Sequence, residues 1–164
     1  MDRFVITEEP ADSDDVRWCF EQYYLELGHG FGYDVDTALP LGLEQLKRPR
    51  GLVLVVRDAG APVGCGAVKL LEDGIGEIKR MWVAPGVRGR GLGGRLLDEL
   101  EAAAAAAGRT ATRLETNEQL GAALALYRKR GYEEVEPFNE EPFATHWFHK
   151  QLTSGATPRG RLIS

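Results

Sequence analysis

The sequence predicts a mixed α/β fold, and three observations lead to that prediction. Short apolar stretches of strand length alternate with longer stretches of helical periodicity. In the middle of the chain, consecutive strands are joined by short turns, which indicates an antiparallel meander. Directly after the meander, a glycine-rich loop leads into a long helix. This order is typical of a central sheet with helices packed on it.

The first part of the chain predicts one strand and two helices. Residues 4–7 form a short apolar strand. Ser13 is a helix N-cap because its hydroxyl can accept a backbone hydrogen bond, and two aspartates follow it in the first turn. This helix is expected to end at Gly28. After a loop rich in glycine and aromatic residues, we expect a second helix over about residues 36–46.

The meander accounts for the centre of the chain. Strands are expected over residues 52–57, 63–71 and 75–83, because the first range is an apolar run and turn residues separate the three ranges. The last two strands are joined by Asp73-Gly74, a dipeptide that strongly favours a hairpin turn. All three strands should therefore be neighbours in one antiparallel sheet.

The second half of the chain predicts two helices and three strands. A long helix with a run of six alanines begins in the glycine-rich loop and ends at Gly108, a natural C-cap. The elements that follow are a strand at 111–116, a helix at 120–130, and two closing strands at 132–135 and 144–150. We expect residues 1–152 to form one domain and residues 153–164 to form a mobile tail.

Composition and charge narrow the class of protein. The chain has 164 residues, of which 43% are hydrophobic and 27% charged, as in an ordinary globular domain. Its net charge of −5 disfavours nucleic acid as a partner. No apolar run approaches the length of a membrane span and no signal peptide is visible, so we expect a cytoplasmic protein without a membrane partner. Cys19 and Cys65 are interpreted as buried, reduced thiols.

The glycine-rich segment Lys79–Arg95 points to a phosphate ligand. It contains five basic residues and no acidic residue, although the chain as a whole is acidic. Glycines let the backbone approach a ligand closely, and the free amides and dipole at a helix N-terminus attract anions. The alternative is a tight helix start that faces solvent.

Two nucleotide motifs compete for this loop. Gly89-x-Gly91-x-x-Gly94 matches the dinucleotide fingerprint, and Glu115 follows about twenty residues later. That fingerprint belongs to parallel strand–helix–strand units, whereas an antiparallel meander precedes the loop here. A nucleoside-triphosphate loop would need a lysine and a hydroxyl residue after the glycines, and Leu92-Gly93-Gly94 supplies neither.

A third interpretation is a family resemblance. Arg88-x-x-Gly91-x-Gly93 resembles the acetyl-CoA pyrophosphate loop of the GNAT superfamily of N-acetyltransferases. The strand Glu77–Val83 is similar to the fourth strand of that family, and Leu126–Tyr132 resembles its late tyrosine motif. The resemblance implies the GNAT fold: an α/β structure with a mixed, mostly antiparallel sheet of about seven strands, flanked by about four helices and splayed between the fourth and fifth strands.

The resemblance also implies acetyl-CoA as co-substrate and no metal. The amides of residues 88–94 would hold the pyrophosphate, and an amide of Met81 or Val83 would bind the thioester carbonyl. Asn117 would touch the cofactor, or would instead cap the helix that follows it. The residues assigned to the cofactor are Met81, Trp82, Val83, Arg88, Gly89, Arg90, Gly91, Leu92, Gly93, Gly94, Asn117 and Tyr127.

Two residues are candidates for the chemistry. An alkylamine is mostly protonated at neutral pH, so a base must remove a proton, and the resemblance assigns this role to Glu77. Its alternative is a strand glutamate paired with Lys79 or Arg80, in which case His146 is the next candidate base. The resemblance places Tyr127 near the sulfur, where its phenol would protonate the leaving thiolate; its alternative is a core aromatic.

The acceptor is expected to be a primary amine, carried by a small molecule or by a protein. Residues 133–141 contain five glutamates and no basic residue, which suits a cationic acceptor or simply a solvated hairpin. The candidate acceptor residues are Phe31, Tyr33, Asn139, Phe143 and His146. Direct attack in a ternary complex is expected because no cysteine lies in the motif region. The alternative function is an acyl-CoA-binding regulatory module without turnover. The protein is expected to be a monomer or a homodimer.

Overall fold

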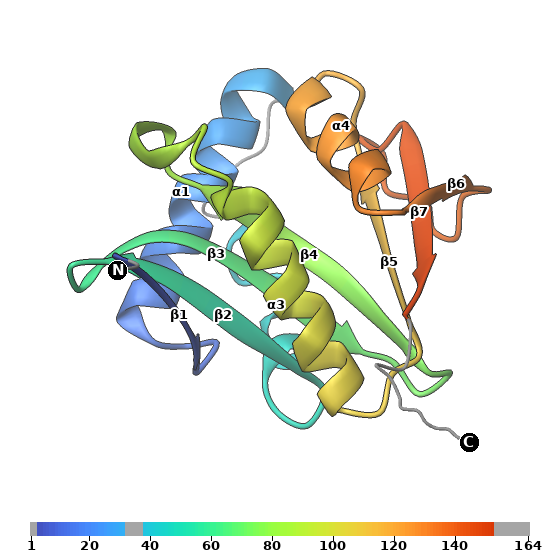
Figure 1. Ribbon diagram of the computed structural model, residues 1–164, viewed down its shortest axis with the longest axis horizontal. Helices are drawn as coiled ribbons and strands as arrows, with labels where there is room; N and C mark the ends of the chain where they lie inside the picture. Colours follow the sequence, from blue (N-terminus) through green and yellow to red (C-terminus); the bar gives the residue numbers. More distant parts are fainter. Residues whose placement is uncertain (1–2, 32–37, 153–164) are drawn as a thin grey trace. The chain divides into compact units, whose positions relative to one another are not determined.

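The computed structural model describes residues 3–31 and 38–152, without the side chains of 29–31 (Figure 1). The elements in chain order are β1 (Phe4–Glu9), α1 (Asp14–Phe31), the 3-10 helix η1 (Leu43–Leu46), β2 (Gly51–Asp58), β3 (Ala61–Leu70), β4 (Ile75–Val83), the 3-10 helix η2 (Pro85–Val87), α3 (Leu92–Ala106), β5 (Ala111–Thr116), α4 (Gly121–Lys129), β6 (Glu133–Val135) and β7 (His146–Gln151).

The strands form one seven-stranded sheet in the order β1-β2-β3-β4-β5-β7-β6. The β1–β2, β2–β3, β5–β7 and β6–β7 pairs are antiparallel, and β4–β5 is parallel. The β4–β5 ladder contains three residue pairs, from Ile75–Ala111 to Glu77–Arg113, whereas β5 and β7 share six. The predicted fold class, a mixed and mostly antiparallel sheet with helices, is confirmed.

The chain divides into two compact units. The first unit comprises residues 1–69 and 78–100, and the second comprises residues 70–77 and 101–164. Each unit is described by itself below. Among the residues that the structure describes, no helix has the length and apolar character needed to cross a membrane.

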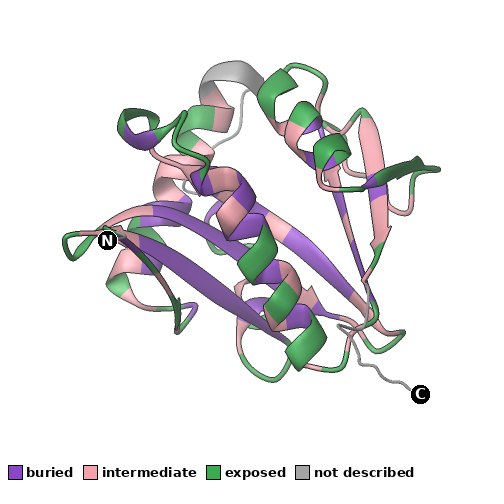
Figure 2. Ribbon diagram, in the orientation of Figure 1, coloured by how far each residue is buried: buried purple, intermediate pink, exposed green. Residues whose placement is uncertain are grey.

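In the first unit, α1 and α3 cover opposite faces of the β2–β3 hairpin (Figure 1). Val55 and Cys65 are register partners, and they pack with the buried face of α1. Side chains alternate between the two faces of a strand, so the neighbouring Gly66 faces α3. A Cβ atom at Gly66 would lie 2.7 Å from Leu100 Cδ1, so only glycine allows α3 to approach this closely. Figure 2 shows β2 buried along most of its length.

Helix α1 starts where the sequence predicts and ends later. Ser13 Oγ accepts a hydrogen bond from the Val16 amide at 3.2 Å, which confirms the predicted N-cap. The helix continues through Gly28, the predicted end, as far as Phe31. A glycine near a helix end favours a C-cap but does not require one, because it also adopts helical angles at a modest entropic cost.

The helix predicted over residues 36–46 is formed only in part among its described residues: Ala38 is helical, and the helix does not continue beyond it. Residues 36–37 lie outside the described residues, and residues 39–42 form turns that lead into η1. Pro40 lacks an amide hydrogen, and Gly42 has a φ of 72°, so neither continues a helix. The predicted tail, residues 153–164, also lies outside the described residues.

The second unit is built on β5, β7 and β6. Phe148 of β7 is fully buried, and Leu114, Tyr127 and Tyr132 are also buried. The Tyr132 hydroxyl lies 2.7 Å from Thr112 Oγ1 and donates a hydrogen bond to Glu101 at 2.9 Å, so its buried oxygen is well partnered. Strands β5 and β7, which are distant in sequence, pair in register, and Tyr127 of α4 packs on Phe148 of β7.

Candidate functional site

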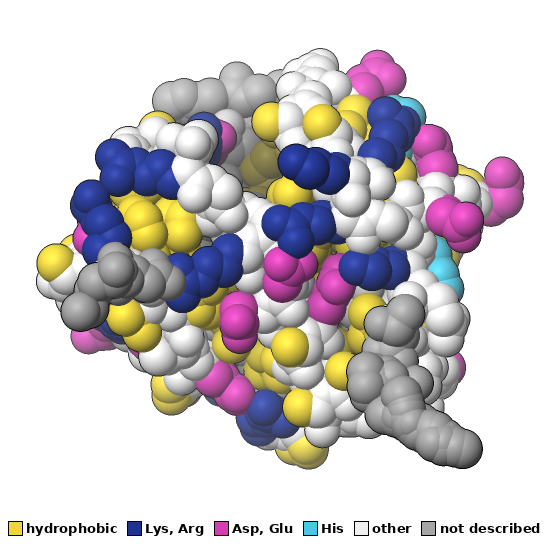
Figure 3. All heavy atoms as spheres, in the orientation of Figure 1, with side chains coloured by type: hydrophobic (Ala, Val, Ile, Leu, Met, Phe, Trp, Pro, Cys, Tyr) yellow, Lys and Arg dark blue, Asp and Glu magenta, His cyan; other side chains and the backbone are white. Residues whose placement is uncertain are grey.

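The glycine-rich loop of the first unit joins the end of β4 to α3. Gly89 and Gly91 have φ angles of 82° and 77°, in the left-handed region that favours glycine. A Cβ atom on either glycine would meet no other atom within 4 Å, so their backbones border open space. Lys and Arg side chains gather over this loop in Figure 3. The loop therefore exposes its backbone among positively charged side chains, as the sequence predicts.

The amides of this loop form a set of hydrogen-bond donors. The Val87, Arg88 and Arg95 amides donate to the carbonyls of Ala84, Pro85 and Gly91. Among the hydrogen bonds between described residues, none is donated by an amide of residues 89–94. These amides include the first turn of α3, which has no partner inside the helix. A run of such donors at the positive end of a helix dipole is suited to bind phosphate.

Arg88 is held against the first unit's own structure. Its Nε donates to the Val83 carbonyl at 2.8 Å, and its Nη2 donates to Glu26 Oε1 at 2.6 Å. The same oxygen of Glu26 accepts a hydrogen bond from Trp82 Nε1 at 3.1 Å. Arg88 and Trp82 therefore connect the loop, β4 and α1 through one carboxylate. Glu26 had no signal in the sequence, because it lies 62 residues from Arg88.

The other predicted cofactor residues of this unit have different surroundings. Trp82 is buried and contacts the Trp18 ring edge to face at 5.8 Å. Met81 and Val83 are half-buried. Arg90 is exposed, as expected of a loop residue. Leu92, the first residue of α3, is buried, so its side chain anchors the start of the helix while its amide stays at the loop.

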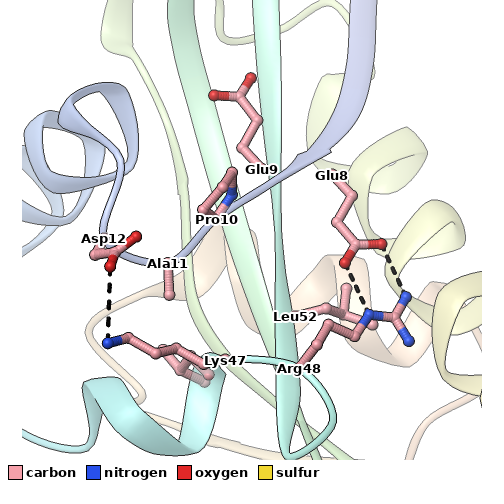
Figure 4. Close-up of a pocket in the computed structure, with 9 residues that line it drawn as sticks. Glu8, Glu9, Pro10, Ala11, Asp12, Lys47, Arg48 and Leu52 are labelled. Carbon is pink, nitrogen blue, oxygen red and sulfur yellow. Dashed lines mark hydrogen bonds and ion pairs between the residues drawn. The ribbon is translucent and has the colours of Figure 1, made fainter.

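A separate pocket of about 450 Å³ lies in the first unit, between the end of β1 and the segment after η1 (Figure 4). Its charged side chains are paired: Arg48 donates two hydrogen bonds of 2.8 Å to Glu8, which lowers the pKa of that carboxyl group, and Lys47 lies 3.7 Å from Asp12. The pocket is lined by Glu8, Glu9, Pro10, Ala11, Asp12, Leu46, Lys47, Arg48 and Leu52. None of these was predicted as a site residue.

In the second unit, Tyr127 is buried, and its hydroxyl has no partner among the residues that the structure describes. Its side chain is 7% exposed and packs on the rings of Tyr132 and Phe148, at 5.9 and 6.1 Å. Burial, reinforced by the charge of Glu115, raises the pKa of Tyr127 to about 12. Its hydroxyl makes no hydrogen bond within the described part of the chain. A buried hydroxyl normally has a partner, so this one is suited to a ligand.

Glu77 is a buried carboxylate with a cationic partner. It is 5% exposed, and its Oε1 accepts hydrogen bonds from Arg113 Nε at 3.0 Å and Nη2 at 2.9 Å. The Arg113 guanidinium in turn lies 4.2 Å from the centre of the Phe138 ring. The sequence pointed to Lys79 or Arg80 as the structural partner of Glu77. Arg113 was missed because it comes from the parallel neighbour β5, 36 residues away.

The two predicted asparagines organise the segment between β6 and β7. Asn117 Nδ2 donates to the Phe143 carbonyl at 2.5 Å, and its Oδ1 accepts from the Gln119 amide at 2.8 Å. Asn139 donates to Glu115 at 2.9 Å and accepts from Trp147 Nε1 at 2.8 Å. Both side-chain amides are thus engaged by the protein and hold this segment in place.

The remaining acceptor candidates are only partly described. His146 Nδ1 lies 2.7 Å from Glu134 Oε2, and this hydrogen bond lowers the pKa of Glu134. Phe143 is 37% exposed. Figure 3 shows Asp and Glu side chains over β6, as the five glutamates of the sequence predict. Tyr33 lies outside the described residues, as does the side chain of Phe31.

Comparisons with known proteins agree with this arrangement. The family model described as "Acetyltransferase (GNAT) domain" matches residues 49–134. The chain is 43% identical over 107 residues to an IAA acetyltransferase of Azospirillum brasilense, covering 65% of this chain and 70% of that protein. A crystal structure described as an acyl-CoA N-acyltransferase, from Klebsiella pneumoniae, is 31% identical, with a TM-score of 0.75 over 91% of this chain and 97% of that one. The Salmonella typhimurium protein yncA, solved with its cofactor acetyl-CoA, has a TM-score of 0.70 at 18% identity, over 98% and 100% of the two chains.

Proposed function

The chain belongs to the GNAT family of N-acetyltransferases, and on that premise we propose that it transfers the acetyl group of acetyl-CoA to a primary amine by direct attack in a ternary complex. The observation that carries this proposal is the run of amides at residues 89–94, none of which donates a hydrogen bond to another described residue. A pyrophosphate offers the acceptors that such a run requires.

The cofactor would be held mainly by the backbone of the first unit. The amides of Gly89–Gly94 would bind the pyrophosphate, and the basic side chains of the loop would add a favourable charge. Arg88 acts indirectly in this proposal, because its guanidinium already binds the Val83 carbonyl and Glu26. It fixes the loop relative to the end of β4. The neighbour yncA, which carries acetyl-CoA, supports acetyl-CoA as the cofactor here.

The end of β4 would stabilise the charge that develops on the thioester oxygen. We assign this role to the amide of Met81 or Val83, since both residues directly precede the loop. A preorganised amide at an oxyanion contributes substantially to the rate, because it needs no reorganisation during the reaction. Trp82, which lies between them, is buried and hydrogen-bonded to Glu26, and so fixes the strand end.

Tyr127 would assist the departure of the thiolate. A phenol with a pKa of about 12 stays protonated at neutral pH, so it is a hydrogen-bond donor and not a base. An ordinary thiol has a pKa of ~8.5 and is the stronger acid of the two. The hydroxyl would therefore stabilise the leaving sulfur by donating a hydrogen bond, without complete transfer of its proton. The absence of any other partner within the described chain supports this role.

Glu77 is our proposed general base, acting through a water molecule. Arg113 stabilises the ionised carboxylate, which is the form that a base requires. The same contact also suits a structural ion pair, and the pH profile of Glu77→Gln distinguishes the two roles. His146, the second candidate, is hydrogen-bonded to Glu134 in the segment that holds the acceptor candidates.

Direct attack on the thioester is favoured over an acetylated cysteine. Cys19 and Cys65 are free thiols with no exposed surface, and burial raises the pKa of Cys65 well above its usual value. A nucleophilic cysteine needs an accessible thiolate, and neither residue is accessible. The acetyl group would therefore pass to the amine in one step, with both substrates bound.

An assay of CoA release over an amine panel tests the proposal. The panel holds a polyamine, free amino acids, an aminated antibiotic and a lysine peptide, each titrated against acetyl-CoA. We expect saturable, amine-dependent CoA release, with initial-rate lines that intersect, as a ternary complex requires. Parallel lines would contradict direct attack. Tight binding of acetyl-CoA without CoA release for any amine would instead support an acyl-CoA-binding module without turnover.

A further inference from the structure

Arg80 of β4 has an unusual combination of backbone and side-chain environments. We propose that Arg80 is a positioning residue for acetyl transfer: its buried side chain holds a bend in β4 that sets the direction of the Met81 and Val83 amides. This inference rests on the proposed function, which assigns one of those amides to the thioester oxygen. All contacts that carry it lie in the first unit.

The backbone at Arg80 is in a conformation that residues other than glycine rarely adopt. Its φ is 55°, in the left-handed region. Ala59 is the one other described non-glycine residue with a positive φ, and it lies in the turn between β2 and β3. Arg80, in contrast, lies inside a strand. Such a conformation persists only where the surrounding structure enforces it.

Contacts of the Arg80 side chain hold the backbone in this conformation. The residue is 8% exposed, and its guanidinium lies over the rings of Phe20 and Tyr24, at 4.6 and 5.0 Å from their centres. Its Nη1 donates to the Leu39 carbonyl at 3.2 Å, and its Nη2 donates to the Leu41 carbonyl. The side chain therefore packs on two rings of α1 and is hydrogen-bonded to the segment before η1.

The two carbonyls are matched to this guanidinium. In the turns before η1, the carbonyls of Ala38, Pro40 and Gly42 accept backbone hydrogen bonds. Within the described chain, the intervening carbonyls of Leu39 and Leu41 accept no backbone bond and are both bound by Arg80. The planar guanidinium of arginine can donate to both carbonyls while it stacks on the aromatic rings. A lysine ammonium cannot span both carbonyls in the same way.

The bend is also fixed from the strand side. The Arg80 carbonyl accepts a hydrogen bond from the Cys65 thiol at 3.3 Å. The next residue in the chain is Met81, so any rotation about the Arg80 backbone redirects the following peptide planes. A buried arginine outside the glycine-rich loop would in this way control the geometry of the reaction.

The test compares Arg80→Lys with the wild type and with Arg57→Lys as a matched control. Arg57 belongs to the same unit and donates to Glu9 at 2.7 Å, but it is not part of the proposed machinery. In Arg80→Lys we expect faster amide hydrogen exchange in peptides covering residues 39–41 and 79–83. We also expect kcat per CoA-binding site to fall by ~10-fold or more, the effect of a misdirected oxyanion donor, with a smaller change in KM for acetyl-CoA. Arg57→Lys should change none of these.

Two outcomes would overturn the inference. One is a lower Tm in Arg80→Lys with unchanged exchange in residues 79–83 and unchanged kcat per site, which would make Arg80 merely structural. The other is an equal loss of kcat in both variants. Should Arg80→Lys fail to fold, Tyr24→Leu removes one ring face and should shift exchange and kcat in the same direction. If the wild type releases no CoA, the proposed function fails, while hydrogen exchange on the free protein still decides whether Arg80 holds β4.

Discussion

At the scale of single residues, Tyr127 and Tyr132 are a natural comparison: both are buried, but among the described residues only the Tyr132 hydroxyl has hydrogen-bond partners. Tyr127→Phe removes a hydroxyl that we assign to the leaving sulfur. We expect kcat to fall by ~10²-fold or more, the scale for removing a preorganised hydrogen-bond donor to a developing negative charge. KM for acetyl-CoA should change little because the interaction belongs to the transition state. Steady-state kinetics measures kcat and KM, and urea unfolding measures the stability of each variant.

Tyr132→Phe is the control and should behave in the opposite way. It removes the hydrogen bonds from the Tyr132 hydroxyl to Thr112 and to Glu101, which keeps its ion pair with Lys150, so the free energy of unfolding should drop by about 1–3 kcal/mol. The value of kcat per folded molecule should stay at the wild-type level. Tyr127 would be only a core aromatic if Tyr127→Phe kept full activity.

Glu77→Gln separates a general base from a strand ion pair. The variant keeps the shape of the side chain but loses its basicity, so activity should fall most at low pH, where the amine is most protonated. Raising the pH supplies neutral amine and should restore part of the activity. The measurement is a pH profile of kcat/KM. Glu8→Gln, which also breaks a carboxylate–arginine pair, serves as the control and should keep the wild-type profile. If Glu77→Gln has the wild-type profile and rate, the base must be sought elsewhere, with His146 first.

At the scale of elements, the loop before α3 depends on glycine for its conformation. Gly91→Val forces a β-branched residue to adopt a φ of 77°, although the side chain itself has open space. The strain of about 1–2 kcal/mol should displace the loop amides and weaken CoA binding by about tenfold. Calorimetric titration with CoA measures this loss, and circular dichroism should show the fold intact. Gly86→Ala adds a methyl group at a glycine without a positive φ and should bind CoA normally. Equal affinity in both variants would refute a phosphate role for this loop.

The elements also show what local sequence can predict. Strands β4 and β5 have the predicted bounds because turn residues on their N-terminal sides, Gly74 and Gly108, punctuate the chain. The helix expected over residues 36–46 does not continue beyond Ala38, because Pro40 and Gly42 outweigh the apolar spacing around them. The left-handed backbone of Arg80 had no local signal in the sequence, because the carbonyls that bind its side chain lie 39 and 41 residues away.

At the scale of the whole molecule, motif order identified the fold and the family, while the assignment of partners required the structure. The loop, the fourth strand and the late tyrosine are all readable from sequence, because each depends on a few adjacent residues. Glu26 and Arg113 are not, because each acts on a site residue from a different element. A net charge of −5 likewise conceals the basic loop, which is a local property.

The central claim is that the loop before α3 binds acetyl-CoA, and thermal unfolding of the full chain with different nucleotides tests it most directly. A ligand that binds only the native state stabilises it by about 2.7 kcal/mol at a concentration of 100 times its Kd. For a chain of this size such a gain should raise Tm by about 5–10 °C. We predict that acetyl-CoA produces this shift and that NADH and ATP at the same concentration produce much smaller ones. A larger shift with NADH than with acetyl-CoA would contradict the account and favour a dinucleotide site.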